Sequence, residues 1–308
     1  VLPACFHKIG PCMARALHLL INRHAGAFTN GLTLDDIVSQ LNDAGWSPVD
    51  VTDITDDIEA GIEEACEKSG DYFAIAAGDG TINAFASALS RMTAPPPLLV
   101  LPAGTANLLA KRLNGEGDMA ATIVASADFE PKKIPCGRVD EKLFLIAAAV
   151  GITPAFAKAR ELLREPPHEG RLTRIWRYLR AGLRNLTKRY LGFRLDQDDY
   201  LRRGRAAYIS VGHMDDAHAR DGESEFQPLL EIYGGRPFGV VDLSIMLARA
   251  AMHDFKHQKR AWRATALRIE AYSKRRIPLI IDGEPCYADA PVVFELIEDA
   301  LCVMAPKA

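Results

Sequence analysis

The stretch Ala74-Ile-Ala-Ala-Gly-Asp-Gly-Thr-Ile-Asn83 decides the fold class of the first half of this chain. An apolar run ends in a glycine-rich loop, and a predicted helix follows the loop. A second unit of the same form occurs at Leu99-Val-Leu-Pro-Ala-Gly-Thr-Ala-Asn107. Strand, loop and helix are the repeating unit of a parallel sheet, because neighbouring parallel strands need a crossover connection.

The segments around these two units continue the same alternation. Thr33 and Asp36 have the spacing of a capping box, which predicts a helix start nearby. The pattern predicts strands over 16–22, 47–52, 72–77 and 98–101, and helices over 32–44, 56–68, from the first glycine loop to 90, and from the second loop through 110. We therefore expect an N-terminal α/β domain with a parallel sheet over residues 14–134.

The pattern changes after about residue 135, where short β-like segments are separated by turn residues. Strands are predicted over 143–150, 205–211, 229–233, 240–247, 266–271 and 277–281, and one helix over 171–190. Runs of strands without intervening helices favour an antiparallel sheet or sandwich. We expect a C-terminal β-sandwich-like domain over residues 135–298, and a chain of 308 residues is long enough for two domains.

Composition argues against several classes of protein. Hydrophobic residues make up 48% of the chain and charged residues 25%, as in folded proteins, and a net charge of −3 gives no sign of nucleic-acid binding. The six cysteines include no C-x-x-C pair, which argues against a zinc site or disulfide framework and favours a cytoplasmic protein. His253 and His257 have no evident third metal ligand. The apolar run over 143–157 is shorter than the roughly 20 residues of a membrane-spanning helix.

The two glycine loops are candidate phosphate-binding sites. Glycine lets the backbone approach a phosphate closely, and the helix that follows directs free N–H groups at the anion. Both loops fall at the carboxyl ends of parallel strands, where ligands bind in open sheets. Asp79 is an anion in such a loop, and Mg²⁺ would bridge it to a triphosphate. The alternative is a pair of ordinary tight turns, but two on successive strands favour a nucleotide-binding domain.

Four motifs occur in order along the chain: Asn22-x-x-Ala25-Gly26, Ala77-Gly-Asp-Gly-Thr81-x-Asn83, Leu101-Pro-x-Gly-Thr105-x-Asn107 and Asp282-Gly-Glu-Pro285. Their order and spacing resemble the diacylglycerol kinase catalytic family, which includes bacterial lipid kinases, sphingosine kinases and ceramide kinases. The resemblance implies an ATP-binding α/β domain, a β-rich domain for the lipid substrate, and an active site between them. It also implies that the tail over 299–308 returns to the first domain.

The resemblance further implies roles for individual residues. Glu284 matches the family's proton acceptor, and Asp79 would be a second catalytic residue that binds Mg²⁺. A carboxylate can take the proton of the attacking hydroxyl while Mg²⁺ and backbone donors hold the γ-phosphate. Taken alone, Asp282-Gly-Glu284 would predict a hairpin turn, since Asp-Gly is a favoured turn pair. The implied ATP-binding residues are Asn22, Arg23, His24, Ala25, Gly26, Thr52, Ala77, Gly78, Asp79, Gly80, Thr81, Asn83, Gly104, Thr105 and Asn107.

Several positions depart from the family's pattern. Ala77 replaces the first glycine of the usual G-G-D-G-T, and Ala84 stands where a glutamate commonly follows the asparagine. Leu108 occupies a position that is commonly acidic. The family's Asp-Gly that holds a structural Mg²⁺ aligns with Phe238-Gly239, so we expect that metal site to be absent. These changes bear on the choice of acceptor and on the level of activity.

The segment 158–194 is strongly basic, with eleven Lys or Arg and three acidic residues. Apolar residues recur in it at three- and four-residue spacing, which is typical of one face of a helix. A basic amphipathic helix can lie on an anionic membrane, so we expect peripheral binding at the inner membrane face. The alternative is that the apolar face packs on the β-rich domain while the arginines are merely solvated.

These observations predict a cytoplasmic, ATP-dependent lipid kinase that phosphorylates a hydroxyl of diacylglycerol or a related lipid. One alternative is a small-molecule kinase on the related NAD kinase fold, which shares the G-D-G-T loop. The Pro-Ala-Gly-Thr-Ala-Asn loop and the Asp-Gly-Glu motif favour the lipid branch. A second alternative is a catalytically weak nucleotide-binding regulator, motivated by Ala84, Leu108 and Phe238. The sequence leaves a homodimer open and does not indicate a nucleic-acid partner.

Overall fold

The computed structural model describes residues 15–29, 31–68, 70–151, 173–174, 176–178, 180, 190–196, 198–214, 226–235 and 261–307. The predicted strand over 240–247, the Phe238-Gly239 position, the two histidines and most of the predicted helix over 171–190 lie outside these residues. Within that helix, residues 173–174, 176–178 and 180 are helical. In the described part of the chain, no helix is long and apolar enough to cross a membrane.

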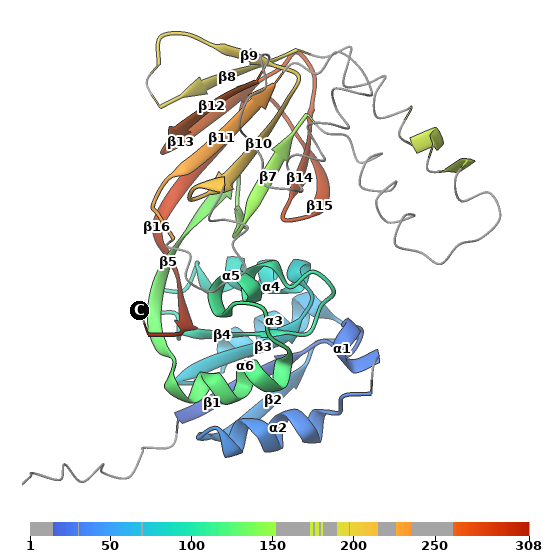
Figure 1. The fold of residues 1–308 in the computed structure, drawn as a ribbon, viewed down its shortest axis with the longest axis vertical. Coiled ribbons are helices and arrows are strands. Elements are labelled where there is room, and N and C mark those ends of the chain that lie inside the picture. Colours follow the sequence, from blue (N-terminus) through green and yellow to red (C-terminus); the bar gives the residue numbers. More distant parts are fainter. Residues whose placement is uncertain are drawn as a thin grey trace, which may run out of the picture.

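A parallel sheet flanked by helices forms the first half of the molecule, in the lower part of Figure 1. Its strands run in the order β2-β1-β3-β4. They are β1 (Arg15–Ile21), β2 (Trp46–Asp53), β3 (Tyr72–Ala77) and β4 (Leu98–Pro102). The helices are α1 (Gly26–Thr29), α2 (Leu34–Asp43), α3 (Ile58–Glu67), α4 (Asp79–Leu89), α5 (Leu108–Asn114) and α6 (Met119–Ala125), and a short 3₁₀ turn (Ser126–Asp128) follows.

Local capping signals set several of these helix starts. The predicted capping box is confirmed: Asp36 N–H donates to Thr33 Oγ1 at 3.2 Å, and Thr33 N–H donates to Asp36 Oδ2 at 3.1 Å. Asp57 caps α3 by accepting the Ala60 N–H, and Asp118 caps α6 by accepting the Ala121 N–H. Helix α6 was not predicted from the sequence. Helix α5 begins at Leu108 and ends at Asn114, later than predicted at both ends.

Both faces of the central strands β3 and β4 are buried, which explains why these two strands are apolar throughout. Ile75 and Val100 pack on one face with side chains of α3 and α4. Ala74 and Leu99 point to the opposite face, where α2 and α6 cover them. Successive side chains along a strand alternate between faces, so each strand contributes to two separate hydrophobic layers.

The second half is built from two facing β-sheets. A six-stranded antiparallel sheet has the order β12-β11-β10-β7-β14-β15, and the remaining strands belong to the extended sheet that also contains β4. The strands are β5 (Glu130–Val139), β6 (Lys142–Phe144), β7 (Ala147–Val150), β8 (Leu191–Leu195), β9 (Arg202–Gly204), β10 (Ala206–Val211), β11 (Leu230–Gly235), β12 (Ala261–Ala266), β13 (Arg268–Tyr272), β14 (Ile277–Ile281), β15 (Glu284–Ala288) and β16 (Val292–Ala305).

One hydrophobic core lies between these two sheets. The extended sheet contributes Phe193 and Phe294, and the six-stranded sheet contributes Ile209 and Leu279. All four side chains are almost completely buried. The predicted fold class, an α/β half with a parallel sheet and a β-sandwich-like half, is therefore confirmed.

The long strand β16 passes through both halves, as Figure 1 shows. Its first part pairs antiparallel with β13, where Phe294 lies opposite Ile269. Near its end, Val303 pairs in parallel with Leu98 of β4. Strand β5 accompanies β16 along both parts, with a register shift between Ile297 and Leu301. We propose a first domain over residues 14–134 and a second over 135–298, with the tail over 299–308 joined to the first domain. The boundary between the two domains falls inside β5.

Two predicted strands are each divided in the structure. The segment predicted as one strand over 143–150 forms β6 and β7, which belong to different sheets. The segment 266–271 likewise spans the end of β12 and the start of β13, with a break at Leu267. In both places the chain crosses between sheets without a Gly or Pro to mark the change. Strands β5, β8, β9, β15 and β16 were not predicted.

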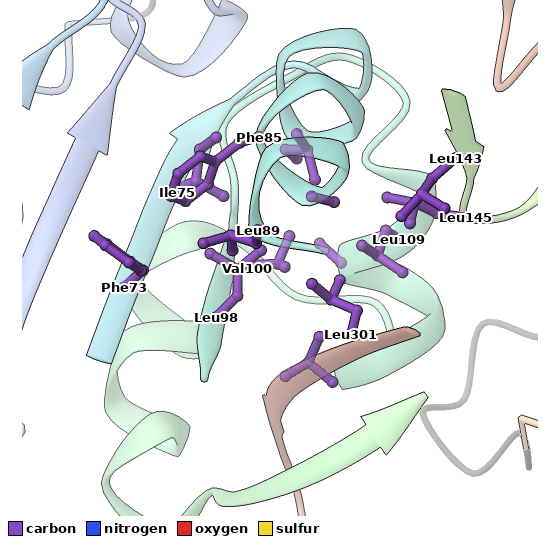
Figure 2. Packing of buried hydrophobic residues seen from close by; sticks show 14 of the residues in the cluster. Phe73, Ile75, Phe85, Leu89, Leu98, Val100, Leu109, Leu143, Leu145 and Leu301 are labelled. Atoms are coloured by element: carbon purple, nitrogen blue, oxygen red, sulfur yellow. The ribbon is translucent and has the colours of Figure 1, made fainter. Parts of the chain in front are cut away.

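The first core also takes side chains from distant parts of the chain. Figure 2 shows Leu143 and Leu145 beside Leu109, and Leu301 of β16 lies in the same cluster. Each of these four side chains is at most 4% exposed. The connection between β6 and β7 is therefore packed against the first domain even though it leads into the second.

A substitution in β16 tests this dependence. Val303 is completely buried. We expect Val303→Asp to lower the free energy of unfolding by about 3–5 kcal/mol, because it leaves an unpaired charge in the core. Cys302→Asp is the matched control, because Cys302 is adjacent to Val303 in the chain but is only half-buried and lies opposite Lys133. Denaturant unfolding followed by circular dichroism measures both, and equal small losses would contradict the packing described.

Candidate functional site

Three loops meet at the carboxyl edge of the parallel sheet. Asn22, which follows β1, donates its N–H to the Ala76 carbonyl of β3 at 3.1 Å. Ala27 in α1 donates its N–H to the Ala103 carbonyl after β4 at 2.9 Å. The loops after β1, β3 and β4 are thus joined by backbone hydrogen bonds, as the positions of the first three motifs predict.

The two glycine loops are packed backbone to backbone. A Cβ atom on Gly104 would lie 2.9 Å from Gly78 Cα and 3.1 Å from Asn107 Oδ1, so a side chain there would separate the loops. A Cβ atom on Gly78 would meet no atom of the described residues within 4 Å, which shows that this side of the loop is open. Glycine is therefore required at position 104 so that the two loops can approach each other closely. At position 78, glycine leaves the backbone accessible to a ligand.

Two groups at these loops remain without an internal partner among the described residues. Gly78 is the N-cap of α4 and makes no side-chain cap hydrogen bond, so the first N–H groups of the helix can donate to an external anion. Asn107 has a left-handed backbone with φ of 52°, and its buried Oδ1 atom has no hydrogen-bond partner in the described structure. A buried, unpaired polar atom is costly unless a ligand or water satisfies it.

Asp79 lies at the start of α4 and stabilises the start of α5. Its Oδ1 atom accepts the Leu108 N–H at 2.8 Å, and the amides of Asn107 and Leu109 also donate to the carboxylate. Burial raises the pKa of the Asp79 carboxyl, while these amide donors oppose the rise. The side chain therefore links the two glycine loops through the N-terminus of α5.

The Asp282-Gly283 pair forms the tight turn between β14 and β15. Both residues have positive φ, 44° and 98°, and Ile281 pairs directly with Glu284. This is the two-residue hairpin that the Asp-Gly pair alone predicts. Glu284 is exposed at the start of β15, and its Oε1 atom would lie 3.2 Å from a Cβ on Gly80. The turn thus carries a carboxylate of the second domain to the first turn of α4.

Asp282 is enclosed by hydrogen-bond donors. Its Oδ2 atom accepts the Leu145 N–H at 2.6 Å, and its Oδ1 atom accepts the N–H groups of Ile146 and Ala147 at 3.0 and 2.8 Å. Asn83 completes the set by donating to Oδ2 at 2.8 Å. Burial raises the pKa of this carboxyl, against the opposing effect of the four donors.

Some of the remaining predicted ATP ligands are exposed, and others already bond to groups within the protein. The Thr105 side chain is exposed, and Gly26 lies next to it: a Cβ on Gly26 would be 3.8 Å from Thr105 Oγ1. Thr81 and Gly80 are half-buried in the first turn of α4, His24 is exposed, and Ala25 and Ala77 are buried.

Four predicted ligands have internal partners. The Thr52 hydroxyl is buried, 2.8 Å from His18 Nε2, and accepts a hydrogen bond from Lys68. Arg23 forms an ion pair with Asp53 at 2.7 Å. Asn22 Oδ1 accepts the His24 N–H at 2.9 Å. Asn83 donates to Asp282 and also to the Leu143 carbonyl at 2.9 Å, so both of its N–H groups are used.

Sequence reasoning missed the part played by the connection between β6 and β7. A small pocket between the domains is lined by Leu145 and Ile146 of this connection, by Leu108 and Leu109 of α5, and by both Asp79 and Asp282. The sequence offers one signal for this contact: Asp282, an acidic residue, directly follows the apolar strand over 277–281. Among the described residues, no cluster of three or more His, Cys, Asp or Glu could hold a metal by itself.

Comparison with known proteins agrees with this architecture. Residues 16–139 match the family described as the diacylglycerol kinase catalytic domain. The chain is 24% identical to a diacylglycerol kinase from Staphylococcus epidermidis over 203 residues, which is 65% of this chain and 62% of the relative. It is 25% identical to one from Staphylococcus haemolyticus over 140 residues, which is 45% and 42% of the respective chains. The matches thus span about half the length of the curated relatives.

Solved structures extend the similarity in fold beyond the matched segment. A crystal structure of a diacylglycerol kinase from Bacillus anthracis has a TM-score of 0.66 and 13% identity, and covers 94% of this chain and 97% of its own. A second structure from the same organism gives a TM-score of 0.69 at 14% identity with the same coverage. In sequence, the segment 16–139 is thus similar to the diacylglycerol kinase catalytic domain family, and over nearly the whole chain the fold is that of the two solved structures.

Proposed function

We propose that this protein is an ATP-dependent kinase that transfers the γ-phosphate of ATP to a hydroxyl group of a lipid such as diacylglycerol. The observation that carries the proposal is the position of Glu284. Its carboxylate comes from the second domain and lies against Gly80 in the first turn of α4, beside the open glycine loop. A base and an anion-binding helix start are thus held together across the domain boundary.

The phosphate groups of ATP would bind at the joined loops. The uncapped start of α4, the open side of Gly78 and the exposed Thr105 all suit an anion, and helix N-termini bind phosphate well. Asn107 Oδ1 is an acceptor, so it suits a donor such as a bound water or a hydroxyl group of the nucleotide. These features support ATP binding by the loops that the sequence predicted.

Asp79 fits the role of a Mg²⁺ ligand. An ionised carboxylate has about four lone-pair sites, so three amide donors leave it able to bind a cation. The remaining ligands would be phosphate oxygens and water, because the described residues provide no further acidic cluster. When bound, the cation would neutralise charge on the β- and γ-phosphates.

Glu284 would act as the general base. The acceptor hydroxyl gives its proton to this carboxylate while its oxygen forms a bond to the γ-phosphorus. The bond from that phosphorus to the bridging oxygen of ADP breaks, and ADP leaves with that oxygen. An exposed side chain on a rigid two-residue turn suits this role, since the base must reach the substrate yet hold its position.

A lipid acceptor is supported by the names of the curated relatives, which are diacylglycerol kinases. The basic segment over 158–194 would bring the enzyme to an anionic membrane surface, as the sequence predicts. A cytoplasmic location is supported by the four described cysteines, which are all unpaired.

A catalytically weak regulator remains the second candidate, because one observation favours it. Leu108 is 37% exposed and lines the pocket between the domains, where the family commonly has an acidic residue. Ala84 is likewise exposed on α4 in place of a glutamate. A protein that binds ATP but phosphorylates no component of a total lipid extract would be the regulator.

Nucleotide binding is tested at Gly104. We expect Gly104→Ala to raise the dissociation constant of Mg·ATP by at least about tenfold, because the new methyl group would push the Gly78 loop away. Gly117→Ala is the control, since its Cβ would meet Ala121 at an ordinary 3.8 Å. Isothermal titration calorimetry gives both constants, and unchanged affinity in Gly104→Ala would argue against the loops as the ATP site.

Catalysis is tested at Glu284. We expect Glu284→Gln to lower kcat by about 10² to 10⁴, because the amide keeps the size of the side chain and loses its basicity. The affinity for ATP should remain unchanged. Asp289→Asn is the control, since this residue of the same hairpin region is 83% exposed. Transfer of labelled phosphate to lipid is measured, and an active enzyme that tolerates Glu284→Gln would place the base elsewhere.

A further inference from the structure

Two residues outside the proposed chemistry connect the hairpin of Glu284 to helix α4. Asn83 belongs to α4 in the first domain, and Asp282 forms the turn of the second. The Asn83 side-chain amide donates to Asp282 Oδ2 at 2.8 Å and to the Leu143 carbonyl at 2.9 Å. The direction of the amide is determined by chemistry, because both partners are acceptors.

Asn83 therefore has no donor left for a phosphate. An asparagine amide carries two N–H groups, and both are used in these two contacts. Its remaining Oδ1 atom is an acceptor and would repel phosphate oxygens. This differs from the ATP-binding role that the family resemblance implies for Asn83, and it points to a role in joining the domains.

Asp282 is also bound to the connection between β6 and β7, which packs on the first domain. The amides of residues 145–147 donate to its carboxylate, and Asp282 N–H donates back to the Ala147 carbonyl at 2.9 Å. Leu145, Ile146 and Ala147 are buried in the same hydrophobic cluster as Phe85 of α4. The turn is thus bound to a segment that is itself packed on the first domain.

The hairpin contacts α4 at two points on one face. Gly80 and Asn83 are three residues apart, so they are neighbours on the helix surface. Glu284 lies against Gly80, and Asp282 bonds to Asn83. Because only Gly283 separates the two carboxylates in the chain, the bond at Asn83 restricts where the Glu284 side chain can lie along α4.

We infer that Asn83 and Asp282 are positioning residues, which dock the β14–β15 hairpin on α4 and thereby hold Glu284 at the phosphate end of that helix. The docking itself rests on the contacts above. Its consequence for turnover rests on the proposed function, in which Glu284 is the base. Asn83 then affects the rate of phosphate transfer and leaves the affinity for ATP unchanged.

The test compares Asn83→Ala with Ser87→Ala. Ser87 lies one turn further along α4 and accepts the Leu143 N–H at 3.3 Å, so it contacts the same segment without touching the hairpin. We expect Asn83→Ala to lower kcat by about 10- to 100-fold, since small misplacements of a catalytic group are costly. The dissociation constant of Mg·ATP should stay within about twofold for both variants. Ser87→Ala should keep its kcat.

Hydrogen–deuterium exchange supplies a readout that does not depend on activity. The peptide that contains Asp282 to Cys286 should exchange faster in Asn83→Ala and at the wild-type rate in Ser87→Ala. A double-mutant cycle with Asp282→Ala should be non-additive in kcat, because either change alone breaks the same contact. If Asp282→Ala does not fold, the exchange and kinetic results for Asn83→Ala still decide.

The inference is overturned if Asn83→Ala weakens Mg·ATP binding and leaves kcat unchanged, which would make Asn83 a nucleotide ligand. It is also overturned if exchange in the hairpin is unchanged. A wild-type protein that phosphorylates no lipid would refute the proposed function instead. In that case the exchange experiment alone decides the docking: faster exchange in Asn83→Ala supports it, and unchanged exchange refutes it.

Discussion

The pairing of β5 with β16 is the constraint on which the rest of the structure depends. These two strands pair from Val139 opposite Phe294 to Glu130 opposite Ala305, with one irregularity between Ile297 and Leu301, and so pass from one domain into the other. A backbone ladder resists bending more than a flexible linker does, because every displacement breaks several hydrogen bonds together. The two domains are therefore held by a continuous sheet, and the hairpin that carries Glu284 returns to α4 at a defined place.

The candidate site offers mainly backbone groups to a ligand and contains few charged side chains. Helix α4 offers its uncapped N–H groups, and the close approach of Gly104 to Gly78 joins the two loops. The Asp79 carboxylate alone would repel a phosphate, but three backbone amides at the start of α5 hold it in place. An anion fixed in this way is suited to binding a cation between itself and a triphosphate.

The Asp282-Gly-Glu motif divides two tasks between two carboxylates. Asp282 is satisfied by four donors and is part of the structure, whereas Glu284 is exposed and available for chemistry. Removing one partner of such a buried network is costly, since the groups left behind lose their hydrogen bonds without regaining water. A hairpin turn and a catalytic motif were alternative readings of the sequence, and the geometry is compatible with both.

The sequence by itself determined the fold class, the glycine loops at the strand ends and the capping box at Thr33, because these depend on local spacing and turn chemistry. It did not determine the division of 143–150 or 266–271 into strands of different sheets. It also did not show that Asn83 donates to Asp282, 199 residues away, or that the Thr52 hydroxyl is hydrogen-bonded to His18. Only the tertiary structure decided these features, because a side chain's hydrogen-bond partner depends on which distant segments the folded chain brings within about 3 Å of it.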